Sequence, residues 1–122
     1  MSNVSKGLAG ERRAWHALED AGYLVASRRH IGGACDLVAI EIPHEWVEHG
    51  NWTASPIQVP LLIEVKTSTT PFSSFPPADR NALLETAHEY GCEPLLCWWP
   101  TEECGPFWIP ASDWPEQEDT NG

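Results

Sequence analysis

An acid and a base stand two residues apart in an otherwise apolar stretch, "LLIEVKTST" at residues 61–69. The Leu, Ile and Val residues predict a buried β-strand over 59–67. Side chains alternate along a strand, so Glu64 and Lys66 share one face, about 6.6 Å apart along the backbone. Buried charge is unfavourable unless it is paired or bound to a metal. The stretch therefore indicates either a cross-strand ion pair on a solvated face or a site that uses both groups.

A second carboxylate, Asp36, opens the stretch "DLVAI" directly after a glycine-containing turn. It belongs to a predicted strand over 35–42 that would pair antiparallel with the strand carrying Glu64. Two carboxylates on adjacent strands repel each other unless a cation lies between them. Their oxygens, with the backbone carbonyl of Val65, suit Mg²⁺ or Mn²⁺. Lys66 would then hold or deprotonate an attacking water, or stabilise charge on a phosphate.

A third acid, Glu11, lies on a predicted helix over 6–21 that ends at Gly22. The apolar stripe of that helix is predicted to consist of Leu8, Ala14, Trp15 and Leu18. Glu11 is on or beside this stripe, where a carboxylate is unfavourable unless it has a partner. It would either pair with Arg12 or Arg13 at the edge, or bind the metal, directly or through water. Together these residues are the parts needed to hydrolyse a phosphodiester.

The remaining elements follow from apolar periodicity and from Gly and Pro punctuation. We expect strands over 23–29, 94–99 and 106–110, a second helix over 77–90, a flexible loop over 68–76 and a long loop over 43–60. In the 35–42 strand, alternation puts Asp36, Val38 and Ile40 on one face and Cys35, Leu37, Ala39 and Glu41 on the other. Apolar residues on both faces predict a central strand of a sheet covered on both sides.

Length and composition predict one domain over residues 1–114, followed by an acidic, disordered tail over 115–122. No apolar run approaches the roughly 20 residues that a membrane helix needs, and the start lacks a signal-like apolar segment. We therefore expect a cytoplasmic protein without membrane contact, in the host cytoplasm if a phage encodes it. Trp98 and Trp99 must point to opposite faces of their strand, one into the core and the other toward an interface or a base.

The net charge of −11 argues at first against a nucleic-acid partner. Its distribution is uneven, because all seven Lys and Arg residues lie in 1–80 beside nine acids, whereas 81–122 holds nine acids and no Lys or Arg. Any surface that binds a polyanion must therefore come from the first two thirds of the chain.

Four cysteines are present, and free thiols are expected in a cytoplasmic protein. Cys92, Cys97 and Cys104, with His88, form the one candidate zinc cluster, although their spacing fits no common zinc motif. The alternative is that they are small buried side chains.

Asp36, then Glu64-x-Lys66, with Glu11 upstream on a helix, resembles the PD-(D/E)xK nuclease superfamily. The resemblance is closest to its archaeal and phage Holliday junction resolvase branch, and it spans residues 6–99. The similar stretches are "KGLAGERRAWHALEDAGYLV", "GGACDLVAI", "LLIEVKTS" and "LLETAHEYGCEPLLCW". It implies an α/β fold with a restriction-endonuclease-like core, ordered α-β-β-β-α-β-β, in which helices flank a central mixed sheet.

The resemblance also implies roles for individual residues. Asp36 and Glu64 would be metal ligands, Lys66 the catalytic lysine and Glu11 the helical acid. DNA contacts would come from Lys6, Arg12, Arg13, Arg28 and Arg29. The implied protein is a Mg²⁺-dependent homodimer that cuts four-way DNA junctions.

Some features depart from that family. Cys35 stands where the superfamily name has proline, Trp98 and Trp99 occur where resolvases tend to carry a basic residue, and the 43–60 loop is long. A nicking, repair or restriction-type nuclease, a catalytically silent DNA-binding module and a zinc-binding interaction domain remain as alternatives.

Overall fold

The computed structural model describes residues 3–27, 35–41 and 59–115. Most of the predicted 43–60 loop and of the predicted tail therefore lies outside the described residues. The elements are, in chain order, α1 (Asn3–Asp20), β1 (Tyr23–Ser27), β2 (Leu37–Glu41), β3 (Leu61–Lys66), α4 (Pro77–Tyr90), β4 (Glu93–Trp98), β5 (Phe107–Pro110) and the 3-10 turn η2 (Ala111–Asp113). The predicted order of one helix, three strands, a second helix and two strands is confirmed.

The five strands form one mixed sheet in the order β1-β2-β3-β4-β5. β1, β2 and β3 are antiparallel neighbours, as expected for the hairpin that carries the acids. β4 runs parallel to β3 after the α4 crossover, and β5 is antiparallel to β4. Leu37 at the start of β2 pairs with Ile63, so β2 begins beside the carboxyl end of β3. That end of β3 and the end of β4 meet at one edge of the sheet.

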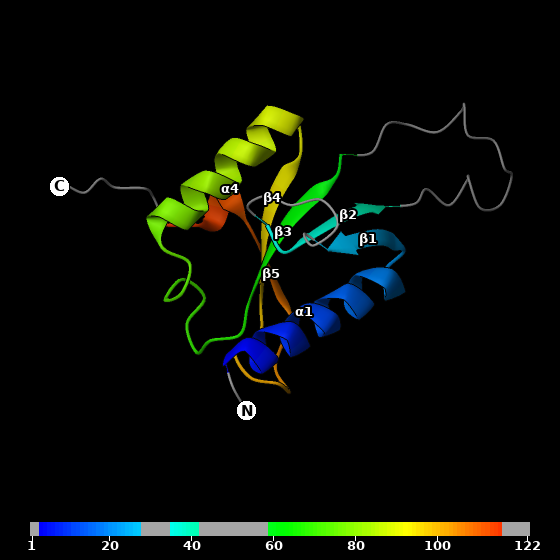
Figure 1. Cartoon of the computed structure of the whole chain (residues 1–122), viewed down its shortest axis with the longest axis vertical. Helices are drawn as coiled ribbons and strands as arrows, with labels where there is room; N and C mark the ends of the chain where they lie inside the picture. Colours follow the sequence, from blue (N-terminus) through cyan, green and yellow to red (C-terminus); the bar gives the residue numbers. More distant parts are fainter. Residues whose placement is uncertain (1–2, 28–34, 42–58, 116–122) are drawn as a thin grey trace, which may run out of the picture.

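The two helices cover opposite faces of the sheet, with α1 on one side and α4 on the other (Figure 1). None of the helices in the described ranges is long and apolar enough to cross a membrane. The predicted α/β fold, a central mixed sheet flanked by helices, is therefore confirmed.

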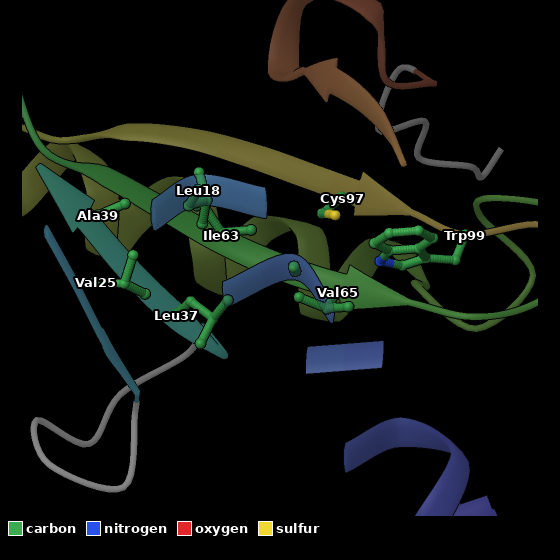
Figure 2. Packing of buried hydrophobic residues seen from close by; sticks show 9 residues of the cluster. Leu18, Val25, Leu37, Ala39, Ile63, Val65, Cys97 and Trp99 are labelled. Atoms are coloured by element: carbon green, nitrogen blue, oxygen red, sulfur yellow. The ribbon is translucent and has the colours of Figure 1, made fainter. Parts of the chain in front are cut away.

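The core under α1 is built from residues of the helix and of four strands (Figure 2). Its buried members are Ala14, Leu18, Val25, Leu37, Ala39, Ile63, Val65, Cys97 and Trp99. The predicted stripe on α1 is partly wrong, because Leu8 is 44% exposed. The buried line instead runs through Gly10, Ala14 and Leu18, each four residues from the next, so the helix is rotated relative to our prediction.

Gly10 explains this rotation. A Cβ atom at position 10 would collide with the Cγ2 methyl of Thr67, which follows β3. Glycine therefore lets α1 approach the end of β3 closely. This contact places the first half of α1 against the edge of the sheet where β3 and β4 end.

The core under α4 contains the buried residues Cys35, Leu62, Phe75, Leu83, Ala87, Leu96 and Trp114. α4 begins at Pro77, where a missing N–H costs nothing, and it ends at Gly91 with a left-handed φ of 69°. Leu83 and Ala87 are buried as predicted. The placement of Cys35 was wrong: its side chain packs with the α4 core although Leu37 and Ala39 face α1. The reason is that β2 begins only at Leu37, so strict alternation does not extend back to Cys35.

Candidate active site

Asp36 is fastened to β3 by its backbone and by its side chain. Its N–H donates to the carbonyl of Ile63 at 2.8 Å, and its Oδ2 accepts the N–H of Val65 at 2.8 Å. Asp36 is 9% exposed, so this carboxylate occupies a fixed position at the sheet edge. The carbonyl of Val65 points to the same side of β3 as its N–H, as in any strand. Asp36 and the Val65 carbonyl are therefore directed to the same side of β3.

Glu64 and Lys66 lie on the opposite face from α1, because they alternate with Ile63 and Val65. The Lys66 Nζ is 3.1 Å from Glu64 Oε2, and the two side chains are only 19% and 15% exposed. The alternative of a cross-strand ion pair on a solvated face is therefore wrong. The ion pair exists, but it lies within one strand and is largely buried.

The pKa of Glu64 is raised from 4.5 to about 7, chiefly by burial and next by the neighbouring Asp36 carboxylate. Lys66 acts in the opposite direction, and Asp79, in the first turn of α4, adds to the rise. The Asp36 carboxylate thus disfavours ionisation of Glu64 across the end of β3. A cation between them would relieve that repulsion.

Lys66 also rests above an aromatic ring. Its Nζ lies 5.8 Å from the ring centroid of Phe75, which is 1% exposed and makes an edge contact with Trp114 at 5.1 Å. The backbone of Phe75 is held by Arg80, whose Nη1 donates to the Phe75 carbonyl at 2.6 Å. The segment predicted to be a flexible loop therefore contains an anchored support for Lys66.

These supporting residues were missed by the sequence analysis. Phe75 was assigned to a loop, and Arg80 and Asp79 were given no role. One signal was available: Arg80 is the only Lys or Arg on the second helix. Trp98, for which the sequence left core and interface open, is near the site: it pairs with Lys66 in the sheet register, and its indole N–H donates to the Ser68 carbonyl at 2.7 Å.

Glu11 lies on α1, on the other face of the sheet from Glu64 and Lys66. Its side chain lines a cavity of about 350 Å³ together with Arg12, Ser27 and Leu37. Leu37 directly follows Asp36, so Glu11 lies at the same end of the sheet as the other two acids. The structure thus brings Asp36, Glu64 and Lys66 together and places Glu11 at the same end of the sheet but on its other face.

The predicted DNA-binding residues fall into two groups. Arg12 is exposed on α1, and Arg13, the next residue, stacks on Trp99 with its guanidinium carbon 4.5 Å from the ring centroid. Arg28, Arg29 and the side chain of Lys6 lie outside the described residues. Their predicted contacts with DNA stay predictions.

The alternative of a zinc cluster is not supported by the described residues. Within the described ranges, no group of three or more His, Cys, Asp or Glu side chains is arranged to hold a metal ion. Cys97 is buried in the α1 core, Cys92 is partly buried against the α4 core and Cys104 is exposed. Burial also raises the pKa of the Cys97 thiol to about 12, which keeps it protonated.

A hard divalent cation fits the donors at the end of β3. Asp36 and Glu64 offer carboxylate oxygens, and the Val65 carbonyl is directed to the side of β3 where Asp36 binds. Mg²⁺ commonly retains several waters and uses one or two protein carboxylates, so two carboxylates suffice. The mutual repulsion of the two acids favours such a cation further.

No family model and no curated protein matches the chain by sequence. The fold, in contrast, is similar to that of Hjc, a Holliday junction resolvase from the archaeal hyperthermophile Archaeoglobus fulgidus. The similarity has a TM-score of 0.64 and 21% sequence identity, and it covers 93% of this chain and 79% of that one. The chain therefore shares the fold of an archaeal resolvase, and the case for its chemistry has to come from its own residues.

Proposed function

We propose that the protein is a Mg²⁺-dependent endonuclease that hydrolyses phosphodiester bonds in DNA, with branched four-way junctions as its preferred substrate. The observation that carries the proposal is the meeting of Asp36, Glu64 and Lys66 at the end of β3. Two opposed carboxylates beside a buried lysine suit the attack of water on a phosphate better than they suit a structural role. The fold shared with a resolvase supports the choice of substrate.

Each residue has a distinct part in this proposal. Asp36 and Glu64 would hold the cation with the Val65 carbonyl, and Mn²⁺ would serve as an alternative to Mg²⁺. The bound cation would lower the pKa of a coordinated water and offset charge on the phosphate. Lys66, held by Glu64 and supported by Phe75, would orient the water and stabilise the charge that develops. Glu11 would act through water from the other face.

A homodimer would put two such sites on opposed strands of one junction. It would also double the number of basic side chains that face DNA, which matters in a chain with a net charge of −11. Of the predicted DNA contacts, Lys6, Arg28 and Arg29 would extend this face beyond Arg12 and Arg13.

A substrate panel tests the proposal. Purified protein is incubated with four-way junction, flap, nicked and linear DNA of matched sequence, in Mg²⁺, in Mn²⁺ and in EDTA. We expect metal-dependent cleavage that is fastest on the junction. Equal cleavage of linear duplex would favour a repair- or restriction-type nuclease, and junction binding without turnover would favour a catalytically silent module. Either result would contradict the proposed substrate or activity.

A further inference from the structure

A second cavity, of about 340 Å³, lies at the same edge of the sheet but under α1. Its polar lining comes from Arg13, Thr67, Thr69, Trp99, Thr101 and Glu102. Thr67 directly follows β3, and Trp99 is the core residue that lies beyond Val65 (Figure 2). The cavity is therefore separated from Lys66 by the thickness of β3.

Arg13 is the distinctive member of this lining. Its guanidinium stacks on the Trp99 ring at 4.5 Å, which fixes the plane of its N–H donors. Its Nε is buried without a hydrogen-bond partner. A positioned guanidinium whose Nε–H lacks an acceptor among the described residues suits a ligand that brings its own acceptor oxygens.

The remaining polar groups define the chemistry of that acceptor. Three threonines line the same cavity, and each hydroxyl is able to donate a hydrogen bond. The one acid, Glu102, is exposed, so its carboxylate remains hydrated. A donor-rich cavity with a planar cation suits an oxyanion with several acceptor oxygens, such as phosphate.

The cavity is tied to the candidate active site through the backbone. The N–H of Trp99 donates to the carbonyl of Lys66 at 2.8 Å, so a lining residue is bonded directly to the lysine that would face the phosphate. A DNA strand that crosses the end of β3 would meet both Lys66 and Arg13, one on each side.

We propose that the cavity lined by Arg13, Trp99 and the three threonines binds a backbone phosphate of DNA next to the phosphate that is cleaved. The inference rests on the proposed function, because it takes DNA as the ligand. In this role Arg13 binds one backbone phosphate and thereby fixes the position of the DNA strand relative to Lys66. It also explains why, in the part of the chain that the structure describes, the Nε of a stacked arginine has no hydrogen-bond partner.

Nuclear magnetic resonance tests this directly. The Arg13 Nε–H signal of full-length protein in EDTA is followed during titration with dimethyl phosphate, with inorganic phosphate and with a single-stranded hexathymidylate. We expect hexathymidylate and dimethyl phosphate to shift that signal. A signal that moves with inorganic phosphate alone would show a site for free phosphate, and a signal that moves with none would overturn the proposal. EDTA prevents cleavage, so a failure of the proposed nuclease activity would leave this result readable.

Variants supply the matched controls. Arg13→Met retains packing on Trp99 but removes the charge, so hexathymidylate should bind about 5- to 10-fold more weakly. The slope of log affinity against log salt should fall by about 0.7, the value for one phosphate contact on single-stranded DNA. Arg13→Lys should preserve the slope, and Glu102→Gln, at the rim, should tighten binding. If Arg13→Met does not fold, the other two variants test the proposal. The salt slope should be preserved in Arg13→Lys, and hexathymidylate should bind more tightly to Glu102→Gln. Unchanged affinity and slope in folded Arg13→Met, or weaker binding in Glu102→Gln, would contradict the proposal.

Discussion

The Lys66 ammonium lies 3.1 Å from the Glu64 carboxylate, and both side chains are less than one fifth exposed. Each carboxylate has two oxygens, so contact of Oε2 with Lys66 leaves Oε1 to face a cation. Removing one member of a buried pair leaves an uncompensated charge, whereas a cation beside Glu64 adds a second partner. The ion pair therefore positions Lys66 while one carboxylate oxygen of Glu64 remains available to bind a cation.

Asp36→Asn should abolish metal binding while the fold survives. The amide oxygen still accepts the Val65 N–H, so we expect a loss of about 1 kcal/mol, the difference between a charged and a neutral acceptor. Thermal unfolding with and without Mg²⁺ measures the effect. Wild type should gain stability from Mg²⁺ and Asp36→Asn should not, whereas Glu93→Gln, at the exposed start of β4, should behave like wild type. An equal gain in Asp36→Asn would refute the assignment of this ligand.

The pH dependence of stability should report Glu64. In metal-free protein its pKa is raised from 4.5 to about 7, so the folded state retains a proton that the unfolded state has already released. This contribution to stability is full below pH 4.5 and is lost as the pH rises through about 7. Glu64→Gln cannot titrate, so its free energy of unfolding should gain about 3 kcal/mol relative to wild type across that range. Urea unfolding in EDTA tests this, and a constant difference would contradict it.

Arg80 should matter for catalysis although it is remote from the acids. Arg80→Met removes the bond to the Phe75 carbonyl at 2.6 Å and should lower the free energy of unfolding by about 1–3 kcal/mol. The support under Lys66 would loosen, so cleavage should slow by about 10- to 100-fold. The neighbouring exposed variant Asn81→Ala serves as the control. Loss of stability with a wild-type rate would show that Phe75 does not position the lysine.

Glycine should be required at position 10 for full stability, because a larger residue would collide with the Thr67 methyl group. Gly10→Ala would collide with the Cγ2 atom of Thr67, and we expect a destabilisation of about 1–3 kcal/mol, typical of overpacking. Gly7→Ala meets nothing within 4 Å and should instead stabilise α1 by up to about 1 kcal/mol. Thr67→Ser removes the methyl, so Gly10→Ala should become stabilising in that background. Urea unfolding of wild type, Gly10→Ala, Thr67→Ser and the double variant completes the cycle. Additive changes in the free energy of unfolding would contradict the contact between positions 10 and 67.

The strands and their pairing were predictable from the sequence because alternation has a fixed period of two. Once the 59–67 segment was assigned as a strand, Glu64 and Lys66 had to share a face, and the preceding strand along the chain, which carries Asp36, was the expected antiparallel partner. The structure bears out both inferences.

The supports of the site were not predictable in the same way. Phe75 lies near the Lys66 ammonium, and Arg80 holds the backbone of Phe75. No local periodicity in the sequence encodes such contacts. The face of α1 was misjudged for a related reason. Its rotation depends on the approach of Gly10 to Thr67, which are 57 positions apart in the sequence.

The most direct test of the account is the single-turnover cleavage rate of a four-way junction by Lys66→Met in Mg²⁺. The change retains the length of the side chain above Phe75 and removes only its charge. We predict a rate at least about 100-fold below wild type, with junction binding and the metal-induced gain in stability preserved. Cleavage at the wild-type rate would contradict the central claim that Lys66 acts at the reacting phosphate.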